Sequence, residues 1–116
     1  MTKMDNARKG LLGFIMYAEK HNDRIPTNFD QAAPYFQDPN LAGALNSDFD
    51  IVYLGPLRAI TKPANVILIQ ERQAWQSSNG EWAKTYGFAD GHVEIHAEAN
   101  GDFSAFEQKH TLPLPR

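Results

Sequence analysis

The residues best suited to chemistry lie in one short segment near the C-terminus, DGHVEIH, residues 90–96. His92, Glu94 and His96 alternate with apolar residues, so on a strand they share one face. Imidazole and carboxylate groups bind metal ions. Neighbouring members lie ~6.6 Å apart, but the outer two lie ~13 Å apart, so one ion could bind only two of them. A third ligand would come from elsewhere, for example His110 or Asp102. The simpler interpretation, which we favour, is an exposed polar strand face.

A second candidate is a pair of tryptophans on either side of an Asn79-Gly80 turn. A two-residue hairpin loop there would place Trp75 and Trp82 on the same face as a diagonal pair. Together with Tyr86 they could form a stacking platform for a sugar or for a protein partner. The alternative, which we favour, is that they cover one end of the core.

Two groups of charged residues have a structural interpretation that we prefer to a functional one. Glu71 could act as a base or ligand, but beside Arg72 at the end of a strand it indicates a local ion pair. Asn46, Asp48 and Asp50 offer oxygen ligands for calcium, yet they lack the spacing of a calcium-binding loop. We expect solvated turn residues there.

Several kinds of chemistry are excluded by composition and motif. The chain has no cysteine, which rules out disulfides, zinc–thiolate sites and thiol catalysis. It has no Gly-x-Ser-x-Gly elbow and no glycine-rich phosphate loop. Its formal net charge of −3 argues against a surface that binds nucleic-acid phosphates. No apolar run is long enough to span a bilayer. We therefore expect no enzymatic activity and no cofactor.

The first predicted element is a helix from about Asp5 to His21. Its apolar residues form one stripe with a 3.6-residue period: Ala7, Leu11, Phe14, Ile15 and Ala18. Gly10 and Gly13 each cost such a helix about 1 kcal/mol relative to alanine, which indicates close packing at these positions. A short second helix is expected after Asn28, which can cap its first turn.

The second half of the chain predicts an antiparallel sheet. Its strands are expected at residues 49–54, 65–70, 83–89 and 92–97, followed by a helical turn at 103–109. A two-residue turn at Asp90-Gly91 would place Phe88 opposite Val93, and Tyr86 opposite Ile95, on the core face. The prediction is an α+β domain over residues 1–110: a long N-terminal helix on an antiparallel sheet of about four strands, with short additional helices. Residues 111–116 are expected to form a flexible Pro-rich tail.

Two segments resemble bacterial type IV pilin-like proteins (pseudopilins) of the group common in Planctomycetes and Verrucomicrobia. The stretch ARKGLLGFIMYAEKHNDRIP, residues 7–26, is similar to their helix and following loop. The stretch YGFADGHVEI, residues 86–95, is similar to their C-terminal Asp-Gly-His signature. The motifs TNFDQAA and AKTYGFADGH, residues 27–33 and 83–92, also resemble domains appended to extracytoplasmic-function sigma factors of the same bacteria.

The resemblance implies a long helix packed on an antiparallel sheet, and protein–protein interaction rather than catalysis. Pilin-like proteins begin with a leader and a hydrophobic anchoring helix, so we expect such a segment to precede Met1 or to have been replaced. The domain would then be extracytoplasmic as part of a pseudopilin, with the membrane reached only through that segment. In a sigma factor it would be cytoplasmic and regulatory. We expect a protein partner, with contacts at Trp75, Trp82, His92 and Glu94 and no direct contact with nucleic acid. A metal-binding domain using His92, Glu94 and His96 is the remaining alternative.

Overall fold

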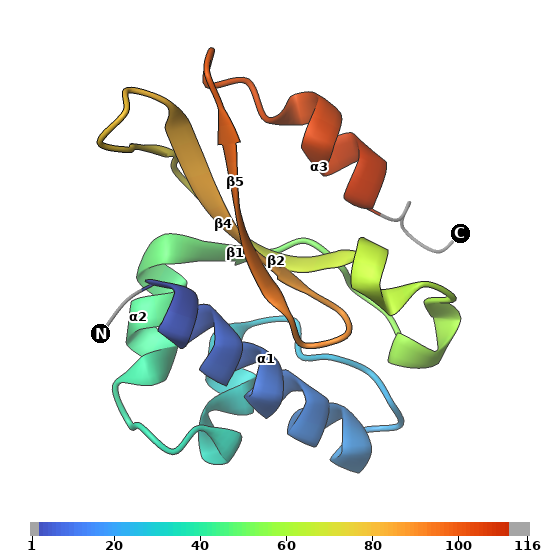
Figure 1. The fold of residues 1–116 in the computed structure, drawn as a ribbon. Helices are drawn as coiled ribbons and strands as arrows, with labels where there is room; N and C mark the ends of the chain where they lie inside the picture. The colour runs from blue at the N-terminus through green and yellow to red at the C-terminus, as the bar shows by residue number, and fades with distance from the viewer. Residues whose placement is uncertain (1–2, 112–116) are drawn as a thin grey trace.

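The computed structural model describes residues 3–111 and has the predicted α+β architecture (Figure 1). The helices are α1 (Lys3–Lys20), α2 (Leu41–Asp48) and α3 (Ser104–His110), with short 3₁₀ helices η1 (Phe29–Tyr35), η2 (Leu57–Ala59) and η3 (Pro63–Asn65). The strands are β1 (Phe49–Ile51), β2 (Ile67–Glu71), β3 (Trp75–Gln76), β4 (Trp82–Phe88) and β5 (Val93–Glu98). No helix within residues 3–111 is long and apolar enough to cross a membrane.

The sheet is antiparallel and is built around β4. Strand β4 pairs with β5 along one edge, and with both β2 and the short β3 along the other. Strand β1 continues the sheet beyond β2. Among the described strands, β5 pairs with β4 alone, so its other edge has no partner strand.

Each face of the sheet carries its own helix and its own apolar core. Helix α1 covers one face, where Leu11 and Phe14 pack into a cluster with Phe49 and Ile69. Helix α3 lies over the other face (Figure 1). A smaller cluster there contains Ile67, Tyr86, Phe88 and Phe103. The apolar stripe of the first helix is thus buried as predicted except at Ile15, which is half-buried, and the sheet is covered on both sides.

The two glycines of α1 lie where the helix comes closest to its neighbours. A Cβ atom on Gly10 would stand 2.8 Å from Cδ1 of Leu45, and one on Gly13 would stand 2.5 Å from Cδ1 of Phe36. Real Cβ atoms do not approach other atoms so closely, so the absent side chains allow α2 and the end of η1 to pack against α1. This confirms the close packing expected from the sequence.

The β4–β5 hairpin differs from the prediction by one residue. The amide of Phe88 donates to the carbonyl of His92, and the amide of Gly91 donates to the carbonyl of Phe88, both at 2.9 Å. The loop therefore contains three residues, with Gly91 in the left-handed region at a φ of 95°. Such a loop, a type I turn followed by a left-handed residue, suits Asp-Gly as well as a two-residue turn does.

The changed register moves the side chains of β5 to the opposite face. Tyr86 is opposite Glu94, and Thr85 is opposite Ile95. The prediction that Tyr86 and Phe88 share a face with Val93 and Ile95 is therefore wrong, because a shift of one residue exchanges the two faces of a strand.

The hairpin between β3 and β4 shows the same deviation. The amide of Ser77 donates to the carbonyl of Glu81 at 2.7 Å, and Gly80 has a φ of 89°. This loop also has three residues, so Trp75 is opposite Ala83 whereas Trp82 is opposite Gln76. The two tryptophans lie on opposite faces of the sheet, and the prediction of a cross-strand pair is wrong.

Other local predictions match the structure. The side chain of Asn28 accepts a hydrogen bond from the amide of Gln31 at 2.9 Å and so caps η1 as expected. Of the predicted tail at residues 111–116, only Thr111 belongs to the described part of the chain. The prediction of a flexible tail over residues 112–116 lies outside the described residues.

Candidate functional site

The segment predicted to be an exposed polar strand face lies partly under α3. His92, Glu94 and His96 do share one face, but Tyr86 and Phe88 of β4 lie on that same face. The ring of His92 stacks on Phe88 with 4.4 Å between centroids, and the ring of His96 stacks on Phe106 of α3 at 3.8 Å. His96 therefore belongs to the aromatic contact between the sheet and α3, whereas His92 packs on a phenylalanine of the neighbouring strand.

The polar atoms of these histidines bind carboxylates of the same strand and its turn. His92 contacts Asp90 through Nδ1 at 2.5 Å and Glu94 through Nε2 at 3.1 Å. His96 contacts Glu98 through Nε2 at 2.6 Å. Within residues 3–111 no group of three or more His, Cys, Asp or Glu side chains is arranged to hold a metal ion. The geometry therefore offers imidazole–carboxylate pairs rather than a ligand set.

The protonation of His92 depends on the two carboxylates beside its imidazole, those of Asp90 and Glu94. Partial burial by itself would lower the pKa of His92, but the hydrogen bonds and charges of Asp90 and Glu94 raise it above the usual 6.5. Partial burial by itself would raise the pKa of Asp90, but the hydrogen bonds with His92 bring the pKa of this carboxyl below its usual value. Both shifts mean that the fold favours the charged forms, the imidazolium of His92 and the carboxylate of Asp90.

The proposed third metal ligands have other partners. His110 Nδ1 lies 2.8 Å from the carbonyl oxygen of Asn65, and its ring packs on Phe106 at 4.6 Å. Asp102 accepts hydrogen bonds from the amide and the hydroxyl of Ser104, at 3.0 and 2.6 Å, where α3 begins. Both residues fix the ends of α3.

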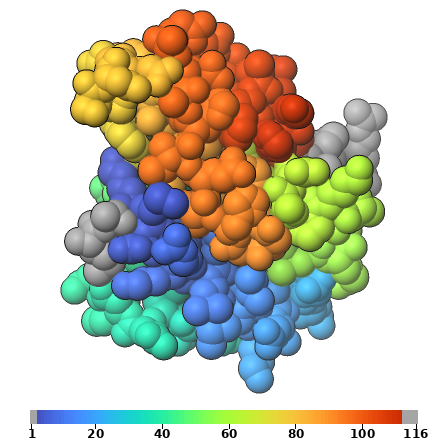
Figure 2. Space-filling model, viewed as in Figure 1, coloured from blue at the N-terminus to red at the C-terminus, as the bar shows by residue number. Residues whose placement is uncertain are grey.

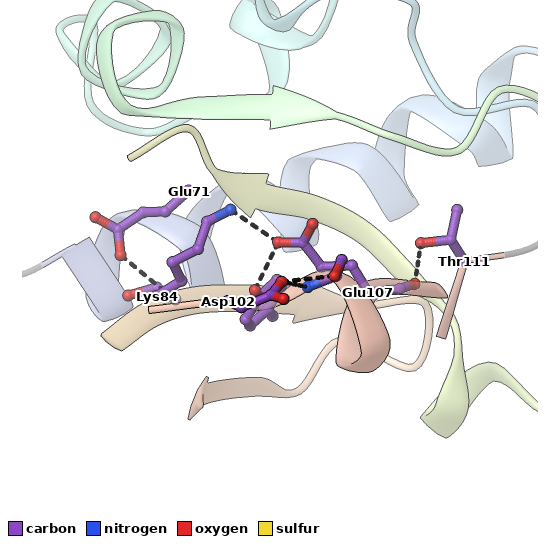
Figure 3. A network of polar contacts seen from close by, with 8 residues as sticks. Glu71, Lys84, Asp102, Glu107 and Thr111 are labelled. Atoms are coloured by element: carbon purple, nitrogen blue, oxygen red, sulfur yellow. Dashed lines mark hydrogen bonds and ion pairs between the residues drawn. The ribbon is translucent and has the colours of Figure 1, made fainter. Parts of the chain in front are cut away.

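A partly buried ion pair, which sequence analysis did not find, attaches α3 to β4 (Figure 3). Oε2 of Glu107 lies 2.7 Å from Nζ of Lys84 and accepts a hydrogen bond of 2.7 Å from the hydroxyl of Tyr86. Burial and the adjacent carboxylate raise the pKa of Tyr86, so its hydroxyl keeps the proton that it donates. One signal was present in the sequence: Lys84 alternates with Tyr86 and Phe88, and a lysine on an apolar strand face requires a counter-ion.

Glu71 is buried and makes a structural contact between sheet and helix. Its Oε1 accepts hydrogen bonds from Trp75 Nε1 at 2.8 Å and from the amide of Thr85 at 2.7 Å. Its Oε2 lies 2.8 Å from Nζ of Lys3 in α1. The prediction of a local ion pair at the strand end is therefore wrong: Glu71 pairs with Lys3, which is distant in sequence.

Arg72 instead binds the C-terminal end of α2. Its guanidinium donates to the carbonyls of Asn46 and Ser47 at 3.0 and 3.2 Å, and to Oδ1 of Asp50 at 3.1 Å. A cation at a helix C-terminus is favourable, since the unpaired carbonyls there carry partial negative charge. Of the three side chains that had suggested a calcium site, the guanidinium binds only that of Asp50. Asn46 and Asp48 belong to α2 and Asp50 to β1, so the expectation of turn residues there is wrong.

The two tryptophans have different environments. Trp75 is half-buried on the α1 side of the sheet. Trp82 is 38% exposed on the α3 side, with Gly101 close beside its ring. The binding residues predicted from the sequence therefore do not form one surface: Trp82, His92 and Glu94 lie on one face and Trp75 on the other.

The largest exposed apolar side chains of α1 form a ridge that sequence analysis did not single out. Leu12 is 59% exposed and Met16, one turn later, is 42% exposed. On one side of this ridge lies a cavity of about 130 Å³ between α1 and the segment from Tyr35 to Leu41. On its other side a shallower hollow reaches the β4–β5 turn at Asp90 and Gly91. Both residues lie off the buried stripe, which is the signal that could have indicated them.

Comparison of the chain with protein-family models, with curated proteins and with solved structures found no match.

Proposed function

We propose that this chain is a non-enzymatic protein–protein interaction domain, and that the Leu12–Met16 ridge of α1 is its main contact surface. The observation that carries the proposal is the exposure of two large apolar side chains one helical turn apart, between two hollows. Contiguous exposed apolar surface of this kind is typical of interaction sites. The partner would place apolar side chains in the hollows on either side of the ridge.

The size of the cavity beside the ridge favours a protein partner over a small molecule. Cofactor and ligand sites usually enclose ~300–1,000 Å³. The cavity of about 130 Å³ is lined by Leu12, Met16 and Phe36 and is too small for such a ligand. The hollow on the other side of the ridge is larger, about 390 Å³, but it is shallow and open and does not enclose a ligand. It has room for an anchoring side chain, which is how interface hot spots bind.

The polar groups of the domain also support a non-catalytic role. Two glutamates with protected carboxylates, Glu71 and Glu107, are held by Lys3 and Lys84. His92 and His96 each bind neighbouring carboxylates and stack on phenylalanines. General acids and bases need a free path to a substrate, and these groups stabilise the fold instead.

The resemblance to pilin-like proteins gives two settings for such a domain. In the first, it is the soluble part of a pseudopilin-type subunit of a secretion apparatus. In the second, it is an accessory domain of an extracytoplasmic-function sigma factor. Both settings require a protein partner and neither requires this domain to touch nucleic acid, in keeping with its net charge of −3.

Site-specific photo-crosslinking in cells of the source organism tests the proposal. A photoreactive amino acid is placed at Leu12 or Met16, and at Leu54, which is 42% exposed, as a matched control away from α1. We expect the same protein to be crosslinked from positions 12 and 16 but not from 54. Envelope proteins would support the pseudopilin setting, and RNA polymerase subunits the sigma-factor setting. Equal labelling from all three positions would contradict the ridge as a contact surface.

A further inference from the structure

The free edge of the sheet carries a pattern that is complementary to itself. Residues 92–98 read His-Val-Glu-Ile-His-Ala-Glu. Counted outward from Ile95, Glu94 is matched by His96, and His92 is matched by Glu98. Val93 is matched by Ala97 in the same way. A strand with this order presents acid opposite base, and apolar opposite apolar, when it meets an antiparallel copy of itself.

The main chain of β5 is oriented to make that contact. The carbonyl of His92 accepts a hydrogen bond from the amide of Phe88, so the main-chain groups of His92 face β4. In an antiparallel pair this orientation alternates along the strand. The main-chain groups of Val93, Ile95 and Ala97 therefore point away from β4, toward the edge that has no partner strand among the described residues.

This edge is accessible. In Figure 2, β5 (orange) is open to the viewer between α1 (blue) and α3 (red). Ile95 is 46% exposed, although it is a large apolar residue in the middle of the strand. Native proteins usually protect such an edge with charged side chains, above all lysine, with proline or with a covering element. β5 contains neither lysine nor proline, and each of its two glutamates is matched by a histidine in an antiparallel copy of the strand. The edge is thus suited to strand addition.

We propose that β5 binds β5 of a second copy of this chain, antiparallel and about a two-fold axis through Ile95, so that the two sheets become one. Ile95 then lies opposite Ile95 of the second copy, and Val93 lies opposite Ala97. Both pairs consist of outward-facing residues, as hydrogen-bonded antiparallel pairs require. A symmetric contact of a surface with itself is the commonest way in which proteins form dimers.

The charged side chains support the same register. Glu94 and His96 form the non-hydrogen-bonded pairs, in which side chains approach most closely, with Cβ atoms ~4.5–5.5 Å apart. Glu94 already contacts His92 through Oε1, and His96 contacts Glu98 through Nε2. Oε2 of Glu94 and Nδ1 of His96 have no hydrogen-bond partner within residues 3–111, so these atoms are available to the second copy.

Sedimentation velocity tests the proposal. Between ~1 μM and ~1 mM we expect the mass to rise from 13.0 kDa to twice that value. Ile95→Lys places two like charges at the two-fold axis and is expected to abolish the dimer. Leu54→Lys, at a site of similar exposure on another part of the surface, is expected to leave it unchanged. A wild-type chain that stays monomeric, or a dimer that persists in Ile95→Lys, would overturn the proposal.

Mixing two variants tests the two-fold axis itself. Ile95→Lys and Ile95→Glu should each be monomeric alone, because residue 95 faces its own copy. An equimolar mixture should form a heterodimer, since lysine then faces glutamate. Both changes are at an exposed position, and circular dichroism checks that each variant is folded. Folded variants that fail to associate when mixed would refute the register through Ile95.

The proposed dimer and the proposed interaction surface on α1 can be refuted independently of each other. Ile95→Lys leaves the Leu12–Met16 ridge intact, so crosslinking from position 12 should continue in this variant. A dimer without specific crosslinks would refute the proposed function and retain this inference. Specific crosslinks from a chain that never dimerises would support the proposed function and refute the dimer.

Discussion

Gly13→Ala is expected to destabilise this protein, whereas Gly43→Ala should stabilise it. Inside a helix alanine is normally favoured over glycine by up to about 1 kcal/mol. Gly43 of α2 receives this gain, because no atom lies within 4 Å of the position that its Cβ would take. At Gly13 the new Cβ would stand 2.5 Å from Cδ1 of the Phe36 ring. Overpacking of this kind costs about 1–3 kcal/mol, which exceeds the gain in helix propensity.

The comparison is measured by thermal and urea unfolding followed by circular dichroism. A net change of about 1 kcal/mol in either direction corresponds to roughly 4 °C for a domain of this size. With an overpacking cost of about 2 kcal/mol and a propensity gain of about 1 kcal/mol, we expect the melting temperature to fall by about 4 °C in Gly13→Ala. In Gly43→Ala it should rise by up to about 4 °C. If Gly13→Ala were stabilised as much as Gly43→Ala, the ring of Phe36 would be free to move aside. The argument that glycine permits close packing of α1 would then be wrong.

Two further predictions concern the face of the sheet under α3. Glu107→Ala should lower the free energy of unfolding, measured with urea, by about 2–3 kcal/mol, because it leaves Lys84 and the hydroxyl of Tyr86 without their partner. Glu19→Ala, at an exposed position, is the control, and an equal effect of both changes would contradict this role of Glu107. The imidazole of His92 should titrate above pH 6.5 by NMR, and Asp90→Asn should lower this midpoint. Because the pKa of His92 is raised in the fold, its charged form adds stability below pH 6.5, and this contribution is lost as the pH rises through the folded pKa. Because the pKa of Asp90 is lowered in the fold, its charged form adds stability above pH 3.8, and this contribution is lost as the pH falls through the folded pKa. The melting temperature of His92→Gln should therefore fall furthest below wild type between about pH 4 and 6.5, and a deficit that grows above pH 8 would refute the assignment.

Much of the local structure could be predicted from residue types and their spacing. The 3.6-residue stripe through Leu11 and Phe14 located the buried face of α1. The side-chain oxygen of Asn28 identified the start of η1, because few residues can cap a first turn. Two glycines in a helix indicated a close approach, which Leu45 and Phe36 make. The stripe and the cap depend on neighbours within one or two turns of the chain. The glycines showed that something packs closely against the helix, but not which distant residues do so.

The site could not be predicted in the same way. Asp90-Gly91 is compatible with hairpin loops of two or three residues, and the choice moved His92 and Glu94 onto the same face as Phe88. That face is covered by α3, which Phe106 and Glu107 attach to it; Glu107 lies 23 residues beyond its partner Lys84. No local pattern specifies contacts at such a separation.

The sequence by itself determined the α+β class, the positions of most elements and the self-complementary order of residues 92–98. Periodicity, capping and turn residues act over a few positions, so these features can be inferred from the order of the residues. Only the tertiary structure decided which face of β5 meets α3, which edge of the sheet stays open and which side of α1 is exposed. These properties depend on strand register and on packing between distant segments, where a change of one residue reverses the outcome.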